Sequence, residues 1–297
     1  MTEQIKKIFR TNIELLELVD KAIVYFREQE DETALELMQP VSEKMRYVVE
    51  GIISDKEYFE LVSTDSLMEM LEGIVEASRC EDYVLLADLL ELQLCTLLCN
   101  VQELIMKKEE YAFFSENMYR EQCLAMTEKL VAAGCEGASV LFETPLNPQE
   151  LLEKGYRVEV TSCGLMTVAV GTDRGSVYLH SNHKIGLEAF LQARSYVKKE
   201  AETYLVKGFG MGYHVEELAK QRPQAKIEVF ENNGQILKLA CAFSPLKAIL
   251  ENDRIVLHYD EDGSKWQERV ENIRENESIC LHMPSVRAVS ALFSLRK

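Results

Sequence analysis

The sequence predicts two parts: an α-helical bundle, followed by an α/β domain with a parallel sheet, helices on both faces and a small antiparallel β element at its start. Apolar residues recur at helical spacing over roughly the first 135 residues. After residue 200, short β-branched runs alternate with helical patterns, which is typical of a parallel sheet. Residues 1–143 hold 13 Lys and Arg against 30 Asp and Glu, whereas residues 144–297 hold 20 of each. We therefore expect an acidic helical domain over 1–143 and an α/β domain over 144–297.

Five helices are expected in the acidic domain. The second, over about 33–53, contains Pro40, which predicts a kink or a break. Ser66-Leu-Met-Glu69 has the pattern of a capping box and predicts the start of the third. The fourth is apolar on nearly all sides, so it should lie at the centre of the bundle. The first, fourth and fifth helices are expected at about 5–19, 83–106 and 115–133.

The α/β domain opens with a short helix and an antiparallel β element. Asn147 and Pro148 predict the N-cap and first residue of this helix. Alternating apolar residues then predict antiparallel strands around 156–160, 168–170 and 177–179, and a helix should follow over 187–199. Strands of the parallel sheet are expected at 203–207, 226–231, 254–259 and 278–282. The helices between them should include one that ends at Pro223 and one that Ser244-Pro245 opens.

The segment 204–214 is the place where several local signals agree on a ligand. It reads as a buried strand, a glycine-rich turn and a helix start, and the next strand ends in an acid, Glu231. This is one βαβ unit of a Rossmann-type nucleotide-binding domain, in which glycines let a ligand approach a helix N-terminus and the acid binds ribose hydroxyls. The alternative is that the glycines only allow tight packing of strand and helix. The candidate ligand-binding residues are Gly208, Gly210, Gly212, Tyr213 and Glu231.

Two further residues are candidates for chemistry. His214 lies at the start of the helix, where an imidazole could act as an acid or base beside a bound anion or sugar; alternatively, it only caps the helix. Asp260 follows the third strand of the sheet, close to where parallel strands place their ligands. We take His214 and Asp260 as the candidate catalytic residues.

The spacing of Gly208, Gly210 and Gly212 resembles the first motif of class I S-adenosylmethionine-dependent methyltransferases. The dinucleotide fingerprint would instead need its third glycine at Tyr213. The resemblance implies S-adenosylmethionine as the cofactor, with Glu231 on the ribose and Asp260 near the adenine. The sequence departs from that family at Val206, where those enzymes usually carry an acid.

The segment Gly-Phe-Gly-Met-Gly-Tyr-His at 208–214, followed by Glu-Glu-Leu at 216–218, is similar to the N-terminal Rossmann-like part of bacterial motility accessory factors. Leu179-His-Ser181 and Glu188-Ala189 also resemble a segment of that family. The resemblance covers about 155–285 and leaves out the acidic helices. It implies a nucleotide-sugar ligand and a role in glycosylating flagellin or another surface molecule with nonulosonic sugars. The family's Ala-Gly-Pro-Ser-Leu-type transferase loop has no counterpart here, so catalysis by this chain stays open.

Three functions therefore remain as hypotheses. The first is a module that binds a nucleotide or S-adenosylmethionine, resembles motility accessory factors and serves surface glycosylation. The second is a class I methyltransferase. The third is a non-catalytic interaction scaffold. If the chain is an enzyme, the resemblances imply a transferase.

The charge distribution excludes two classes of partner. Neither half has the clustered Lys and Arg that phosphate binding needs, so we expect no nucleic acid and no membrane surface as partner. The acidic helices could bind a protein partner, or they could form a solvated surface. The N-terminus lacks the apolar run of a signal peptide, and the eight cysteines include no C-x-x-C pair, so we expect a cytoplasmic protein.

The cysteines and histidines do not predict a metal site. Cys95 and Cys99 lie four residues apart, but the spacing offers no further ligands, and cysteines in apolar patterns are expected as core residues. His180 and His183 match no common ligand spacing. His282 follows the last strand, where a histidine is most often a surface residue.

Overall fold

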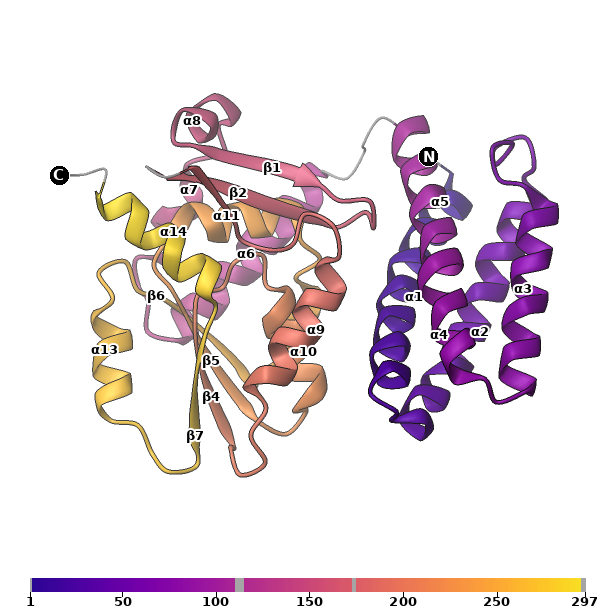
Figure 1. Ribbon diagram of the computed structural model, residues 1–297. Coiled ribbons are helices and arrows are strands. Elements are labelled where there is room, and N and C mark those ends of the chain that lie inside the picture. The colour runs from indigo at the N-terminus through magenta and orange to yellow at the C-terminus, as the bar shows by residue number, and fades with distance from the viewer. Residues whose placement is uncertain (1, 110–114, 173–174, 295–297) are drawn as a thin grey trace. The chain divides into compact units, whose positions relative to one another are not determined.

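The computed structural model describes residues 2–109, 115–172 and 175–294. They fall into two compact units (Figure 1). The helical unit comprises Met1–Ala112 and the turn Thr161–Leu165. The α/β unit comprises Phe113–Val160 and Met166–Lys297. A helical region is thus followed by a region with a parallel sheet and a small antiparallel sheet, as expected.

The helical unit is arranged around its first helix, which contacts α2, α4 and α5. The Thr2 hydroxyl caps this helix by accepting the Ile5 N–H, and its apolar side chains face inward. Asn12 and Gln102 are fully buried and bond to each other at 2.8 Å. The elements of the unit are α1 (Glu3–Arg27), α2 (Asp31–Ser54), α3 (Thr64–Arg79), α4 (Tyr83–Leu89), the π-helical turn η1 (Leu90–Leu94) and α5 (Cys95–Lys108).

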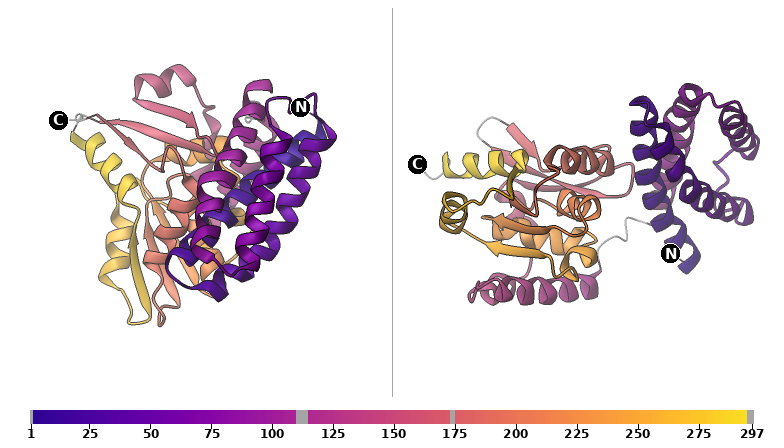
Figure 2. Two further views of the ribbon diagram at one scale, coloured as in Figure 1. Left: turned by 45° about the vertical axis from the view of Figure 1, so that its right-hand side comes forward. Right: turned by 90° about the horizontal axis from the view of Figure 1, so that it is seen from below.

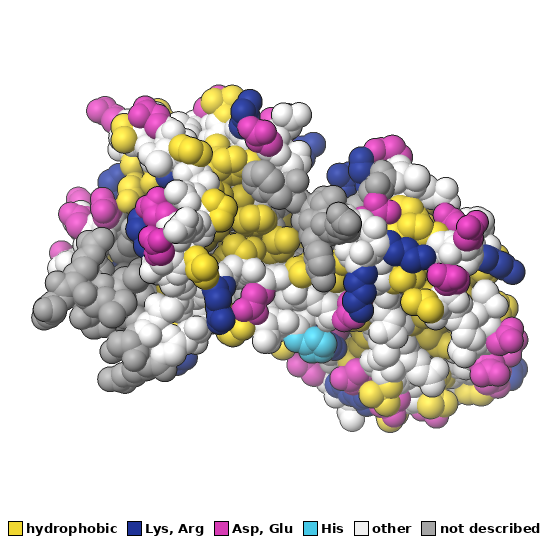
Figure 3. Space-filling model, turned by 90° about the horizontal axis from the view of Figure 1, so that it is seen from above, with side chains coloured by type: hydrophobic (Ala, Val, Ile, Leu, Met, Phe, Trp, Pro, Cys, Tyr) yellow, Lys and Arg dark blue, Asp and Glu magenta, His cyan; other side chains and the backbone are white. Residues whose placement is uncertain are grey.

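Several expectations for these helices need correction. Helix α2 continues through Pro40 without a break. Helix α3 is capped by Ser63, whose hydroxyl accepts the Ser66 N–H, so the predicted capping box at Ser66 is wrong. The apolar stretch from α4 to α5 is not buried on all sides, because Val84 and Leu92 are each 68% exposed. Figure 3 shows acidic side chains spread over the visible face of the helical unit and not gathered in one patch.

One helical stretch among the described residues, Tyr83–Lys108, is long and apolar enough to cross a membrane by length and composition. The core helix of a soluble protein passes the same test. Leu86, Leu94 and Leu98 of this stretch are buried within the helical unit.

The α/β unit contains two sheets. The antiparallel sheet has the order β1-β2-β3, and the parallel sheet has the order β6-β5-β4-β7. The predicted strands 203–207 and 226–231 are confirmed as β4 and β5, and Tyr204 lies opposite Ile227 on β5 and Ser278 on β7. The strands are β1 (Tyr156–Val160), β2 (Met166–Thr172), β3 (Gly175–Tyr178), β4 (Thr203–Lys207), β5 (Lys226–Glu231), β6 (Ile255–Tyr259) and β7 (Glu277–Leu281).

The helices of this unit differ in part from those expected. Ser244 ends α11 and does not open the next helix, which is a single turn. Neither α11 nor α13 was recognisable from the sequence, because α11 is buried on nearly all sides and α13 has no buried residue. The helices are α6 (Glu116–Ala132), α7 (Ala138–Glu143), α8 (Pro148–Glu153), α9 (Ile185–Tyr196), α10 (Tyr213–Gln221), α11 (Gly234–Phe243), α12 (Lys247–Leu250), α13 (Ser264–Glu271) and α14 (Met283–Ser294).

Helix α6 moves the boundary between the units away from the expected place at 143–144. It contacts α11, α12 and β6, and Figure 2 shows it in magenta alongside the sheet. Its buried Gln122 donates to the carbonyls of Cys241 and Ser244 and accepts the Leu246 N–H at 2.8 Å. Because these bonds tie α6 to the sheet layer, the structure divides near residue 112. Helices α6 and α7, which were expected in the acidic domain, therefore belong to the α/β unit.

Candidate functional site

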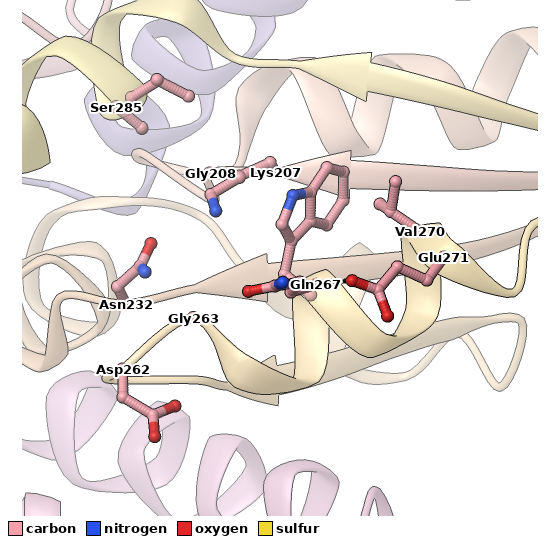
Figure 4. A pocket seen from close by; sticks show the side chains of 11 residues that line it. Lys207, Gly208, Asn232, Asp262, Gly263, Gln267, Val270, Glu271 and Ser285 are labelled. Carbon is pink, nitrogen blue, oxygen red and sulfur yellow. Dashed lines mark hydrogen bonds between the residues drawn. The ribbon is translucent and has the colours of Figure 1, made fainter.

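A cavity of about 600 Å³ lies at the carboxyl ends of the parallel strands (Figure 4). Strand β4 has β5 on one side and β7 on the other. After β4 the chain forms β5 and β6 on one side of this strand and later forms β7 on its other side. Parallel sheets bind ligands at the carboxyl end of a strand where the chain changes sides in this way. The lining residues are Lys207, Gly208, Asn232, Asp262, Gly263, Trp266, Gln267, Val270, Glu271, Ser285 and Val286.

The glycine turn after β4 is shaped by the protein's own side chains. Gly208, Gly210 and Gly212 all have positive φ values, 95°, 53° and 88°. A Cβ at Gly210 would lie 2.8 Å from His180 Nε2, and one at Gly212 would lie 2.9 Å from a methyl group of Ile249. Of these glycines, Gly208 lines the cavity. The other two allow close packing, which was the alternative interpretation of this motif.

Glu231 faces the glycine turn and does not line the cavity. Its carboxylate accepts the Phe209 N–H at 2.7 Å and the Asn233 N–H at 2.9 Å. The residue is 2% exposed. Burial raises the pKa of this carboxyl group, and the main-chain donors oppose that shift. In this position Glu231 holds the turn and is not available to ribose hydroxyls.

Three histidines are stacked behind the glycine turn. His214 and His282 have ring centres 4.2 Å apart and planes 8° apart, and His180 stacks on His282 at 4.9 Å. All three are buried, so the expectation that His282 lies at the surface is wrong. They come from α10, from the residue after β7 and from the segment after β3.

Each histidine is held by a hydrogen bond. His180 Nε2 accepts the Met211 N–H at 3.0 Å, so the proton of the neutral ring lies on Nδ1, 3.7 Å from a carboxylate oxygen of Glu188. His214 Nε2 lies 3.1 Å from the Gly208 carbonyl, which can only accept, so Nε2 carries the proton. His282 Nδ1 lies 2.6 Å from the Ser285 hydroxyl.

Burial keeps two of the rings neutral. It lowers the pKa of His214 to about 3, and the neighbouring His180 adds to the shift. It also lowers the pKa of His282 well below its ordinary value, and the electrostatic repulsion that His214 and His180 would exert on a protonated His282 adds to the shift. A protonated His214 is therefore excluded near neutral pH, and the ring is fixed to the carbonyl of the turn.

The described positions of the three rings do not suit a metal ion, although their nitrogens lie within 4.8 Å of one another. A histidine binds an ion through a lone pair in the plane of its ring. The planes of His214 and His282 are nearly parallel, so they do not meet at a shared ion. The Nε2 lone pair of His180 is already taken by the Met211 N–H.

Tyr213 and Asp260 also contribute to the scaffold around the cavity. The Tyr213 hydroxyl donates to the Met166 carbonyl at 2.9 Å, which ties α10 to β2. Asp260 is 4% exposed, and its carboxylate accepts the N–H groups of Lys265 and Trp266 at the start of α13. Neither side chain lines the cavity.

The cavity is lined by residues that sequence reasoning did not select. Lys207 ends β4, Asn232 follows β5 and Asp262 follows β6, so the rule that ligands bind at the carboxyl ends of parallel strands points to all three. Trp266 and Ser285 lie on α13 and α14. Because neither helix was expected, no sequence signal placed these two side chains at the site.

Comparisons with known proteins give no function for the site. Residues 3–104 match the family "Domain of unknown function (DUF8042)". No curated protein matches the chain. Among solved structures, the crystal structure of MNMC2 from Aquifex aeolicus is 16% identical and has a TM-score of 0.26. The match covers 59% of this chain and 58% of that chain, less than two thirds of its length.

Proposed function

We propose that the α/β unit is a Rossmann-like module that binds a nucleotide-type ligand in the cavity at the carboxyl ends of its strands. The strand order β6-β5-β4-β7 corresponds to the first four strands of a Rossmann sheet, 3-2-1-4, and the cavity lies where that fold binds nucleotides. The glycines and Glu231 shape the turn beside the ligand. The candidate contacts are the residues that line the cavity.

The observation that carries the proposal is the pairing of Lys207 with Trp266 in one cavity. The Lys207 ammonium group lies 5.2 Å from the centre of the Trp266 ring. Within the described residues this ammonium group makes no hydrogen bond or ion pair, so it is available to an anionic ligand. Burial lowers the pKa of Lys207, and a bound phosphate would favour its charged form. An aromatic face beside a cation suits a base linked to a phosphate.

These residues favour a nucleotide or nucleotide sugar over S-adenosylmethionine. The sulfonium of S-adenosylmethionine would lie in the same cavity as the Lys207 ammonium group, whereas phosphate and ammonium attract each other. Asn232 and Asp262 are the polar side chains near the strand ends that could bind sugar hydroxyls. A role in flagellin or surface glycosylation rests on the sequence resemblance and belongs to this proposal. A protein partner for the acidic helices stays a prediction.

Tryptophan fluorescence provides a direct test, because Trp266 is the only tryptophan in the chain. The purified protein would be titrated with CMP, UDP, their sugar conjugates, ATP, S-adenosylmethionine and S-adenosylhomocysteine. A ligand at 100 times its dissociation constant should also raise the free energy of unfolding by about 2.7 kcal/mol. Nucleotides should quench the fluorescence and raise the melting temperature.

Matched variants separate the cavity from non-specific effects. Lys207→Met should weaken nucleotide binding by about tenfold or more, since it removes a charge-assisted contact. Lys247→Ala is the control, because the Lys247 side chain is 83% exposed and lies outside the cavity. Quenching by S-adenosylhomocysteine alone would favour a methyltransferase instead. No response to any compound would overturn the proposal in favour of a scaffold.

A further inference from the structure

The charges around the cavity at the strand ends limit the kind of anion that it can bind. Among the described residues that line the cavity, Lys207 is the one with a cationic side chain. Asp262 and Glu271, at the two ends of α13, line the same cavity, and both are exposed (Figure 4). A ligand with several negative charges would therefore meet one ammonium group and two carboxylates.

The glycine turn after β4 cannot supply the main-chain N–H groups that commonly bind phosphate in such turns. The Gly208 N–H donates to a main-chain carbonyl of β5 at 2.8 Å. The Phe209 N–H donates to the Glu231 carboxylate at 2.7 Å, and the Met211 N–H donates to His180 Nε2 at 3.0 Å. These three N–H groups are used within the protein, and one of them already binds an anion.

The start of α13 is occupied in the same way. The Asp260 carboxylate accepts the N–H groups of Lys265 and Trp266 at 3.1 and 2.9 Å. One carboxylate oxygen of Asp262 accepts the Ser264 N–H at 3.0 Å. A helix N-terminus attracts anions through its unpaired N–H groups and its dipole. Here two carboxylates of the protein take that place, so the start of α13 does not attract a phosphate.

We propose that the cavity selects nucleotides with a single phosphate group and rejects nucleoside di- and triphosphates. The inference rests on the proposed function, because it concerns which nucleotides the same cavity takes. One phosphate group binds the Lys207 ammonium group. A second or third phosphate group finds no further cationic side chain in the lining and shares the cavity with Asp262 and Glu271, so each added negative charge weakens binding.

The test compares nucleosides with their phosphates on the full-length protein. Dissociation constants would be measured for adenosine, cytidine and uridine and for their mono-, di- and triphosphates, by quenching of Trp266 and by calorimetry. In EDTA, the monophosphate of the preferred base should bind most tightly, and its triphosphate should bind about tenfold more weakly or worse. Because salt screens the repulsion between charges, this ratio should shrink as the ionic strength rises.

Removing the two lining carboxylates should relax the selectivity. Asparagine and glutamine keep an oxygen that can accept the Ser264 N–H and the Gln267 amide, so the double variant Asp262→Asn, Glu271→Gln should fold. It should bind the triphosphate about tenfold more tightly than the wild-type protein does, with a smaller change for the monophosphate. The control Glu268→Gln, at an exposed acid of α13 outside the cavity lining, should keep the wild-type ratio.

Circular dichroism would check that the variants are folded, and Glu271→Gln alone would replace an unfolded double variant. If no nucleoside or nucleotide binds, the proposed function fails and this inference fails with it. If triphosphates bind in EDTA as tightly as monophosphates, the inference is overturned and the proposed function stands. Tight triphosphate binding that needs Mg²⁺ would also overturn it, because Asp262 and Glu271 would then hold a cation. An unchanged ratio in the folded double variant would do the same.

Discussion

The carboxylate of Glu231 accepts the main-chain N–H of Phe209 at 2.7 Å, so the acid that ends β5 closes the glycine turn that follows β4. Its other oxygen accepts the Asn233 N–H. The acid and the turn were expected to hold a ligand between them. In the structure they hold each other, and the cavity lies beside them.

Replacing Glu231 by alanine should therefore reduce stability. The change leaves the buried Phe209 N–H and the half-buried Asn233 N–H without their acceptor, which costs about 2–4 kcal/mol of the unfolding free energy. Urea denaturation measures this loss. Glu261→Ala, at an exposed neighbouring acid, should change stability by about 0.5 kcal/mol or less. If Glu231→Ala keeps full stability but loses nucleotide binding, the role of Glu231 is to bind the ligand and not to hold the turn.

Gly210→Ala should destabilise the protein more than Gly263→Ala. Both glycines have positive φ, which costs an alanine about 1–2 kcal/mol. At Gly210 the new Cβ also approaches His180 and His282 within 3 Å, whereas at Gly263 it would lie 3.7 Å from the side chain of Asn232. We expect a total of about 2–4 kcal/mol for Gly210→Ala. Equal unfolding midpoints in urea for the two variants would contradict this prediction, because they would show that the histidines move aside at no cost in stability.

Acid should destabilise the α/β unit through its buried histidines. The folded pKa of His214 lies near 3, below the ordinary value of 6.5, so the unfolded chain binds a proton that the folded protein excludes. The stability is complete above pH 6.5 and is lost as the pH falls toward 3, by about 1.4 kcal/mol per pH unit for each such histidine. His282 has the same sign.

Urea midpoints at pH 7.5, 6 and 5 would measure this dependence. In His214→Gln the free energy of unfolding should change less steeply with pH below 6.5, because unfolding takes up one proton fewer. An unchanged slope in His214→Gln would mean that this ring takes up its proton in the folded state.

The boundary between the units can be tested with two fragments. A fragment of residues 113–297 should unfold cooperatively. A fragment of residues 144–297 should be much less stable, because it lacks the buried Met126 and Leu130 and the three hydrogen bonds of Gln122. Denaturation followed by circular dichroism compares them. Similar stability of the two fragments would support a boundary near residue 143.

The sequence predicted elements well where burial has a simple period. Strands β4 and β5 are buried runs with clear ends, and their expected bounds are confirmed. Helix α11 has no polar face, so its pattern could not be separated from that of a buried strand. Helix α6 follows the earlier helices with no strand between them, so the sequence groups it with them. Its place in the α/β unit depends on Gln122 bonds to residues more than 100 positions away.

The sequence predicted where the candidate site lies, but it did not predict which residues line it. The glycines correctly indicated that some group packs closely against the backbone at the end of β4. The sequence does not reveal that this group is the side chain of His180 at Gly210 and of Ile249 at Gly212. The two segments that resemble motility accessory factors do meet, through the bond from Met211 to His180. They meet behind the turn. Of the residues in these two segments, Gly208 lines the cavity, and the other lining residues lie outside both segments.

The π-helical turn η1 gives the helical unit one place where chain length can vary. The Cys95 N–H donates to the Leu90 carbonyl five residues back, so this turn contains one residue more than an α-helix needs. Deleting Leu92, whose side chain points to solvent, should restore a continuous α-helix and keep the buried faces on either side in phase. Deleting a residue within α5 would instead rotate every later side chain by about 100°. Insertions and deletions among relatives of this chain should therefore gather at residues 90–94.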